Sequence, residues 1–371
     1  MKRIFAKATT LVLASVASVA CAPRTPVSST TIHQPITVGN VTVTPLGSNV
    51  YAAIRSEPLA LAVNANSLFI VNDDHVVVVD AQFTREATQE NIAALRRITS
   101  KPVRYVINTH WHDDHVAGNQ TYRDSFPDVR FIAHTNTRAD LVERGRPNRA
   151  GQVRGAPSAL DRFDHLLAMG LGADSTPATE MERASLSSAV RIMRRYVAEN
   201  AGYREVLPDS TFDRRLTLAS GGRTIEVRWF GRGNTRGDAV TYLPAERIVS
   251  TGDLIVAPIP FAFGSYPTEW IAVVDSIKAL NPSVVVPGHG PVMRDLSYVN
   301  TVQRMIRAAR DETAAAAARG LSADSALAAV RLDALRTEIA GDEKQMRVMF
   351  ASFFRRPIVG QAYAEAKGTL K

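Results

Sequence analysis

The stretch Asn108-Thr-His110-Trp-His112-Asp-Asp114-His115-Val-Ala-Gly118-Asn119 places three histidines and two aspartates within six consecutive positions. It directly follows the apolar run 103–107, which predicts a buried strand that ends at a turn. Buried polar groups without partners cost kilocalories each, so this concentration predicts a ligand bound at the strand end. Imidazole and carboxylate are the ligands of zinc and its first-row neighbours, and the stretch therefore predicts a metal site.

The spacing of the histidines is that of an extended segment rather than of a helix. His110 and His112 are two positions apart, so their side chains point the same way along an extended backbone. The turn that follows can carry Asp114 and His115 to a second, adjacent position. This differs from the pair of zinc-binding histidines four positions apart on a helix.

Residues 110–115 resemble the H-x-H-x-D-H signature of the metallo-β-lactamase superfamily. The resemblance implies an α/β fold, a four-layer αββα sandwich, and a zinc-dependent hydrolase. Two later segments match the same family: Thr251-Gly252-Asp253, with an aspartate that bridges two metals, and Pro287-Gly288-His289-Gly290, with the final ligand. Their order disfavours the alternative, a polar loop that is rich in histidine by chance.

One segment departs from the family pattern. The superfamily usually has G-x-G-H-T, and this chain has Gly231-Arg-Gly-Asn234-Thr235, with asparagine in place of the histidine. An amide oxygen is a weaker zinc ligand than imidazole. We therefore expect Asn234 to be a weak or lost ligand and the first metal position to bind less tightly than the second.

The resemblance also implies a role for each matching residue. It predicts one or two Zn²⁺ per chain, with a single ion in the second position when metal is scarce. Asp114 and Asp253 would be catalytic, because they orient the nucleophile and carry protons. Asp113 either holds a ligand histidine or faces solvent, and its place in the turn favours the former. The implied ligands are His110 and His112 at the first position, Asp114, His115 and His289 at the second, and Asp253 between them or at the second.

The first residues predict export. Residues 1–22 form a signal peptide by pattern, with a basic start, an apolar centre and small residues before Cys21. Their apolar centre is too short for a spanning helix. Cys21, the only cysteine, stands where a bacterial lipoprotein is processed, but Ser18 replaces the usual leucine, so ordinary cleavage is an equal alternative. We expect a periplasmic or secreted protein without disulfides, with or without a lipid on Cys21 that would attach it to a membrane.

The rest of the chain divides into a leader, a sandwich and added helices. Residues 23–36 are typical of a flexible leader, and residues 37–295 are expected to form the metallo-β-lactamase domain. Residues 141–205 predict a helical insertion that either walls the site or only packs against the domain. Residues 296–371 predict a helical extension that covers a sheet face or forms a subunit interface.

Two further features leave alternatives open. The predicted loop 254–270 contains four aromatic residues, which either line an apolar pocket or pack the loop onto the sandwich; a helix is expected to follow at 271–280. The aromatic residues of this loop are Phe261, Phe263, Tyr266 and Trp270.

His134 ends the predicted strand 129–133. A structural hydrogen bond is favoured for it over a ligand role.

Composition narrows the function. Hydrophobic residues make up 45% and charged residues 22% of the 371 residues, as in ordinary globular proteins. The formal charge of +8 is scattered without a basic block, which argues against nucleic-acid binding. The family resemblance implies a small-molecule substrate. The leading prediction is a secreted zinc hydrolase of an ester, lactone, thioester or β-lactam bond, the last disfavoured by Asn234. The alternatives are a mono-iron redox enzyme and a non-enzymatic metal-binding protein with a degenerate site, and the six matching residues disfavour the latter. The oligomeric state does not follow from the sequence.

Overall fold

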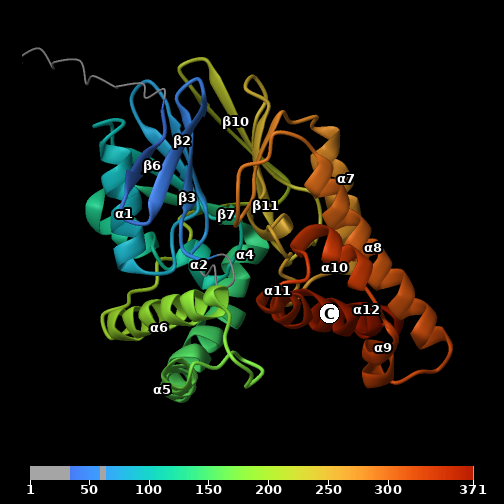
Figure 1. The fold of residues 1–371 in the computed structure, drawn as a ribbon. Coiled ribbons are helices and arrows are strands. Elements are labelled where there is room, and N and C mark those ends of the chain that lie inside the picture. The colour runs from blue at the N-terminus through green and yellow to red at the C-terminus, as the bar shows by residue number, and fades with distance from the viewer. Residues whose placement is uncertain (1–33, 59–63, 371) are drawn as a thin grey trace, which may run out of the picture.

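The computed structural model describes residues 34–58 and 64–370. The predicted signal peptide, Cys21 and most of the leader lie outside these residues. Two β-sheets pack face to face, and helices cover both outer faces (Figure 1). This confirms the expected αββα sandwich.

The first sheet has eight strands in chain order. Its strands from β1 to β5 pair antiparallel, whereas β5 to β8 pair parallel. A parallel pair needs a crossover, and helix α1 (Arg85–Arg96) makes the one between β5 and β6. The strands are β1 (Ile36–Val38), β2 (Val41–Gly47), β3 (Val50–Arg55), β4 (Ser67–Val71), β5 (Val76–Val79), β6 (Val103–Ile107), β7 (Arg130–His134) and β8 (Ser210–Phe212).

The second sheet has five strands in the order β13-β12-β11-β10-β9. Its pairs are antiparallel except for β12 and β13, which helix α7 (Pro267–Ala279) connects in parallel. The strands are β9 (Arg215–Ser220), β10 (Arg223–Trp229), β11 (Ala239–Leu243), β12 (Ile248–Ser250) and β13 (Val284–Val286).

Strand β5 explains why the sandwich needs covering on both sides. Val76 and Val78 pack into the core under α1, whereas Val77 and Val79 pack into the core between the sheets. Side chains alternate across a strand, so four consecutive valines indicate a strand that is buried on both faces. All four are fully buried.

The helix starts follow local sequence signals. Thr84 caps α1, because its side chain accepts a hydrogen bond from the backbone N–H of Ala87. Helix α7 begins at Pro267 rather than at residue 271, so the prediction placed its start four residues too late. Proline suits the first turn of a helix, since it needs no N–H partner there.

The insertion forms a helical hairpin. Helices α5 (Arg146–Met169) and α6 (Glu180–Asn200) lie beside each other beyond one end of the first sheet (Figure 1). The chain reaches α5 through α4 (Thr135–Asp140) and a π-helical turn at Leu141–Gly145. Thr179 and Glu182 form a reciprocal capping box at the start of α6.

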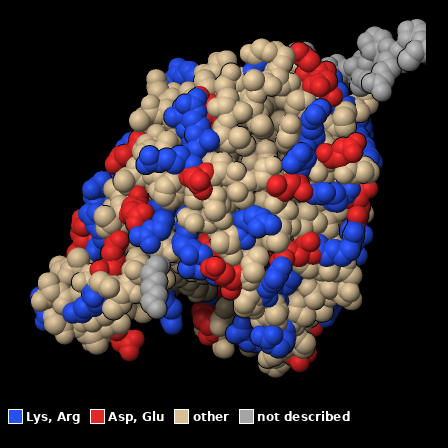
Figure 2. Space-filling model, turned by 180° about the vertical axis from the view of Figure 1, so that it is seen from behind, with Lys and Arg blue, Asp and Glu red and all other residues tan. Residues whose placement is uncertain are grey.

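The C-terminal helices cover the outer face of the second sheet, one of the two predicted alternatives. They share one apolar core with α7. Within the described residues, no helix is both long and apolar enough to cross a membrane. On the face shown in Figure 2, basic and acidic side chains are intermixed. The elements are α8 (Ser297–Ala318), α9 (Ala323–Ala329), α10 (Asp333–Ala340), α11 (Lys344–Met349), the π-helical turn η4 (Phe350–Arg355) and α12 (Arg356–Ala366).

Candidate metal centre

The predicted ligands meet at one edge of the sandwich, where strands of both sheets end. His110 follows β6, and the short helix α2 (Asp113–Val116) carries Asp114 and His115. Asp253 lies in the 3₁₀ turn Gly252–Leu254 after β12, and His289 follows β13. Strands β5 and β6 of the first sheet are parallel, as are β12 and β13 of the second. The carboxyl ends of these strands bring residues distant in sequence together.

The ligand atoms form two adjacent groups. One comprises His110, His112 and Asp253, and the other comprises Asp114, His115 and His289; within each group the ligand atoms lie within 4.8 Å of one another. Nε2 of His110 and Nδ1 of His112 are 2.9 Å apart. Nε2 of His289 is 3.0 Å from Oδ2 of Asp114. The structure thus brings together the residues predicted for each metal position, and it places Asp253 in the same group as His110 and His112.

Asp253 lies between the groups. Its Oδ2 is 3.7 Å from Nε2 of His110. Its Oδ1 is 3.2 Å from Nε2 of His115 and 3.4 Å from Nε2 of His289. One carboxylate oxygen therefore faces each group, which is the arrangement that a bridging ligand requires.

Several of these buried atoms lack a hydrogen-bond partner within the described part of the chain. They are Nε2 of His115, Oδ1 of Asp253, both ring nitrogens of His289 and Oδ1 of Asn234. Leaving such atoms unsatisfied costs about 1–3 kcal/mol each. Nitrogen and carboxylate donors that converge without partners fit a divalent cation of the zinc type.

The pKa values differ between the two groups. Burial, together with the neighbouring imidazoles of His115 and His112, lowers the pKa of His110 well below its usual range. Burial also lowers the pKa of His112. Burial acts in the same direction on His115, but the carboxylates of Asp114, Asp80 and Asp253 raise its pKa well above the usual range. The environment of the first group thus favours neutral imidazoles, whereas the carboxylates around His115 favour its protonated form.

Asp80, which the sequence analysis did not single out, orients histidines of both groups. Its Oδ2 accepts hydrogen bonds of 2.8 Å from Nδ1 of His115 and from the Thr109 hydroxyl. That hydroxyl oxygen lies 3.0 Å from Nδ1 of His110. Both imidazoles are therefore held through Nδ1, and their Nε2 atoms face the site. A lone aspartate directly after the valines of β5 was the signal that could have identified it.

The loop that carries His289 is held closely against the 3₁₀ turn. The Asn66 side-chain amide donates to the carbonyl oxygens of Pro287 and Gly290, at 3.0 and 2.8 Å. A Cβ at Gly288 would overlap Oδ1 of Asp253. Only glycine permits this approach.

Asn234 lies beside Asp253. Its side-chain N–H is 3.4 Å from the Asp253 carbonyl oxygen, a long contact. The Asn234 side chain is 1% exposed, and its amide oxygen has no partner within the described residues. A buried amide, whose oxygen is a neutral and weaker metal ligand than imidazole, thus occupies the position usual for a histidine.

The environment of Asp113 differs from both predicted alternatives. It is buried, so it does not face solvent, and its partners are not ligand histidines. Its Oδ1 lies 3.1 Å from Nη2 of Arg149, and its Oδ2 accepts a hydrogen bond of 2.7 Å from the Tyr196 hydroxyl. Both partners belong to the insertion. The sequence could not predict these contacts, because both partners lie far from Asp113 along the chain.

His134 has the structural role that was favoured. Its Nε2 donates to the carbonyl oxygen of Asp213 at 2.8 Å, and its Nδ1 accepts from the backbone N–H of Asn136. Its ring stacks on Trp229 at 4.9 Å. Burial lowers the pKa of His134, which keeps the imidazole neutral.

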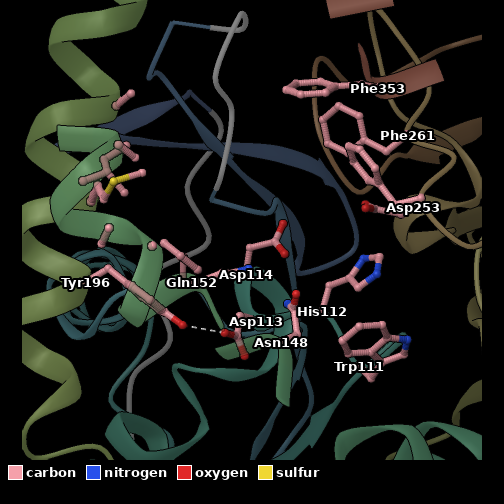
Figure 3. A pocket seen from close by; sticks show the side chains of 18 of the residues that line it. Trp111, His112, Asp113, Asp114, Asn148, Gln152, Tyr196, Asp253, Phe261 and Phe353 are labelled. Carbon is pink, nitrogen blue, oxygen red and sulfur yellow. Dashed lines mark hydrogen bonds between the residues drawn. The ribbon is translucent and has the colours of Figure 1, made fainter. Parts of the chain in front are cut away.

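A cavity of about 730 Å³ opens from the ligands. Its walls come from the insertion on one side and from the loop after Asp253 on the other (Figure 3). The insertion therefore forms a pocket wall. Among the four aromatics of the predicted loop, Phe261 and Phe263 line this cavity, whereas Tyr266 and Trp270 are buried in packing.

The chain is similar in sequence and in fold to known proteins. Residues 61–289 match the sequence model of the metallo-beta-lactamase superfamily. The chain is 23% identical over 279 residues to a linear primary-alkylsulfatase of Pseudomonas sp. (strain ATCC 19151), covering 69% of this chain and 48% of that protein. It thus spans about half the length of that relative. It is 24% identical over 261 residues to a metallo-beta-lactamase type 2 of Bacillus cereus, covering 68% and 78%.

Solved structures show the same fold. A metallo-beta-lactamase from Pontibacter korlensis superposes with a TM-score of 0.50 and 19% identity, over 72% of this chain and 99% of that one. A double mutant of the sec-alkyl sulfatase PisA1 gives a TM-score of 0.58 and 14% identity, over 87% and 50%. The family match and these relatives support a metal-dependent hydrolase. The chain belongs to the metallo-beta-lactamase superfamily.

Proposed function

We propose that this protein is a zinc-dependent hydrolase that cleaves an ester, lactone, thioester or β-lactam-type bond in a small molecule. The observation that carries the proposal is the position of Asp253, whose two oxygens each face one group of buried ligand atoms. Such a site has the donors that zinc prefers.

Zinc, when bound, would supply a nucleophile from water near neutral pH and polarise the scissile carbonyl. The chain's own residues would orient the reactants and move protons. Asp114 and Asp253 both line the cavity, where a carboxylate can accept a proton from the attacking water and return it to the leaving group. Burial raises the pKa of Asp114, but the imidazoles of His115 and His289 outweigh it and keep the group ionised.

We further propose that the second position, with Asp114, His115 and His289, is filled first. Asn234 gives the first position a weaker donor than the usual histidine. Purified protein should therefore retain one zinc ion per chain after dialysis against metal-free buffer. Two tightly held zinc ions would contradict this proposal.

Metal analysis coupled to a substrate panel tests the activity. The panel contains a p-nitrophenyl ester, a lactone, a thioester, a chromogenic cephalosporin, octyl sulfate and a phosphodiester. We expect zinc-dependent hydrolysis of at least one carbonyl substrate and its loss in Asp253→Asn. Iron as the bound metal with oxygen consumption, or turnover of octyl sulfate alone, would reject the proposal.

The export signal predicted for residues 1–22 is also a proposal. Its support is the pattern of basic, apolar and small residues before Cys21. Cell fractionation of the full chain should place the protein outside the cytoplasm. A Cys21→Ser variant that moves from the membrane fraction to the soluble fraction would indicate a lipid anchor.

A further inference from the structure

The cavity beside the metal centre has apolar walls on two sides. Ala159, Phe163 and Ile192 contribute to the wall formed by the insertion. Phe261 and Phe353 face them from the other side (Figure 3). Their rings form an edge-on pair with centroids 5.4 Å apart. The volume of about 730 Å³ is in the range of small-molecule sites.

The opposite wall joins two parts of the chain that are distant in sequence. Phe353 belongs to η4 of the C-terminal helices, and Phe261 to the loop after Asp253. Phe263 also contacts Phe353, with ring centroids 5.5 Å apart, and its side chain is 52% exposed. A large apolar side chain that lines a cavity and stays exposed is available for an apolar ligand.

The carboxylates that line the cavity already have partners or belong to the candidate metal centre. Asp114 and Asp253 belong to the metal centre, and Asp113 pairs with Arg149 and Tyr196. Among the described residues that line the cavity, none is lysine or arginine. A ligand with an anionic tail would therefore lose its hydration without gaining a counter-ion.

We infer that the substrate is a carboxylic ester or lactone that carries a neutral alkyl chain, with the chain held between the insertion and the C-terminal helices. This inference rests on the proposed function. In the reaction, the oxygen of water bonds to the carbonyl carbon, and the ester C–O bond breaks with its electron pair on the departing oxygen. That oxygen takes one proton from water, and the other leaves as the product acid ionises.

Chain length is the first test. With zinc-loaded full-length protein, kcat/KM should rise from p-nitrophenyl butanoate to octanoate by at least tenfold, since each buried methylene is worth about fourfold. The mono-p-nitrophenyl ester of suberic acid has the same chain length but an anionic end, and it should react at least tenfold more slowly than octanoate. Equal rates for octanoate and butanoate, or for octanoate and suberate, would overturn the inference.

Two matched variants on one helix test where the alkyl chain of the substrate binds. Ala189 of α6 lines the cavity, whereas Ala184 of the same helix is exposed and does not. Ala189→Trp should lower the octanoate-to-acetate ratio of kcat/KM about tenfold, and Ala184→Trp should keep the wild-type ratio. Phe263→Ser, which removes a half-exposed ring from the cavity wall, should lower the ratio severalfold. An unchanged ratio in both cavity variants would overturn the inference.

Calorimetric titration with neutral alcohols separates this inference from the proposed function. 1-Octanol should bind at least tenfold more tightly than 1-butanol, and Ala189→Trp should abolish the difference. Octanol binding without hydrolysis of any ester, lactone, thioester or β-lactam would reject the proposed function and support the cavity assignment. Ester hydrolysis with no preference between the alcohols would reject the cavity assignment alone.

Discussion

The Tyr196 hydroxyl donates a hydrogen bond of 2.7 Å to Oδ2 of Asp113, the residue between two predicted metal ligands (Figure 3). Arg149 holds the other oxygen of the same carboxylate. Its guanidinium also lies over the ring of Tyr203, 3.6 Å from the centroid. The buried Asp113 carboxylate thus attaches the insertion to the ligand turn.

Removing the Tyr196 hydroxyl should loosen this attachment. Tyr196→Phe keeps the ring, which stacks on Phe83 at 4.2 Å, but removes a hydrogen bond to a charged group. We expect the free energy of unfolding to fall by about 1.5–3 kcal/mol. Denaturant unfolding measures the loss. Tyr203→Phe, which keeps the ring under Arg149, serves as the control and should change stability by less than about 0.5 kcal/mol. Equal stabilities of the two variants would contradict the role given to the hydrogen bond.

Neutralising Asp80 should weaken metal binding at both positions. Asp80 has a φ of 59°, which asparagine tolerates, so Asp80→Asn preserves the backbone. The variant loses the carboxylate that holds the Nδ1 side of His115, and zinc affinity should fall about 10–100-fold. Competition with a chromogenic chelator measures it. Asp73→Asn, an exposed aspartate before β5, should bind zinc as the wild type does; a matching loss there would point to net charge as the cause.

Restoring the usual histidine should add a metal ion. In Asn234→His an imidazole replaces a neutral amide next to Asp253, so the first position gains a strong donor. Elemental analysis after dialysis should give two zinc ions per chain, compared with one in the wild type. Asn234→Ala should hold no more than the wild type. An Asn234→His protein with unchanged stoichiometry would show that this residue does not belong to the first position.

Removing metal should destabilise the fold. The buried carboxylates and imidazoles of the centre lose their common partner, and any ligand that binds only the folded chain stabilises it. At zinc concentrations about 100 times the dissociation constant, the contribution is about 2.7 kcal/mol. Differential scanning calorimetry should show a lower Tm after chelation, restored by zinc but not by magnesium. A Tm that does not respond to chelation would exclude a tightly bound structural role for the metal.

Stability should depend on pH through His134, away from the metal. Burial lowers the pKa of His134 below its ordinary value of 6.5. Between the two values the unfolded chain binds more protons than the folded chain, so the His134 contribution is lost as pH falls below about 6.5. The stability difference between wild type and His134→Gln should therefore be larger at about pH 7.5 than at about pH 5. His165→Gln, at an exposed site on α5, should show no such change.

The sequence by itself predicted which residues could bind a metal, and it determined the layers of the fold. Residues 110–115, Asp253 and His289 carry chemistry that local spacing displays, and the valines of β5 announce a strand buried on both faces. Thr84 marks the start of α1 for the same local reason, because a cap is satisfied within one turn.

Only the tertiary structure decided which distant side chains meet. Asp113 pairs with Arg149 and Tyr196, and Phe353 lies beside Phe261, because helices far apart in the chain pack at one edge of the sandwich. Such contacts depend on the relative placement of packed layers, and no period or motif in the chain encodes that placement. Sequence motifs therefore predict the candidate ligands, whereas the cavity that would select the substrate exists only in the folded molecule.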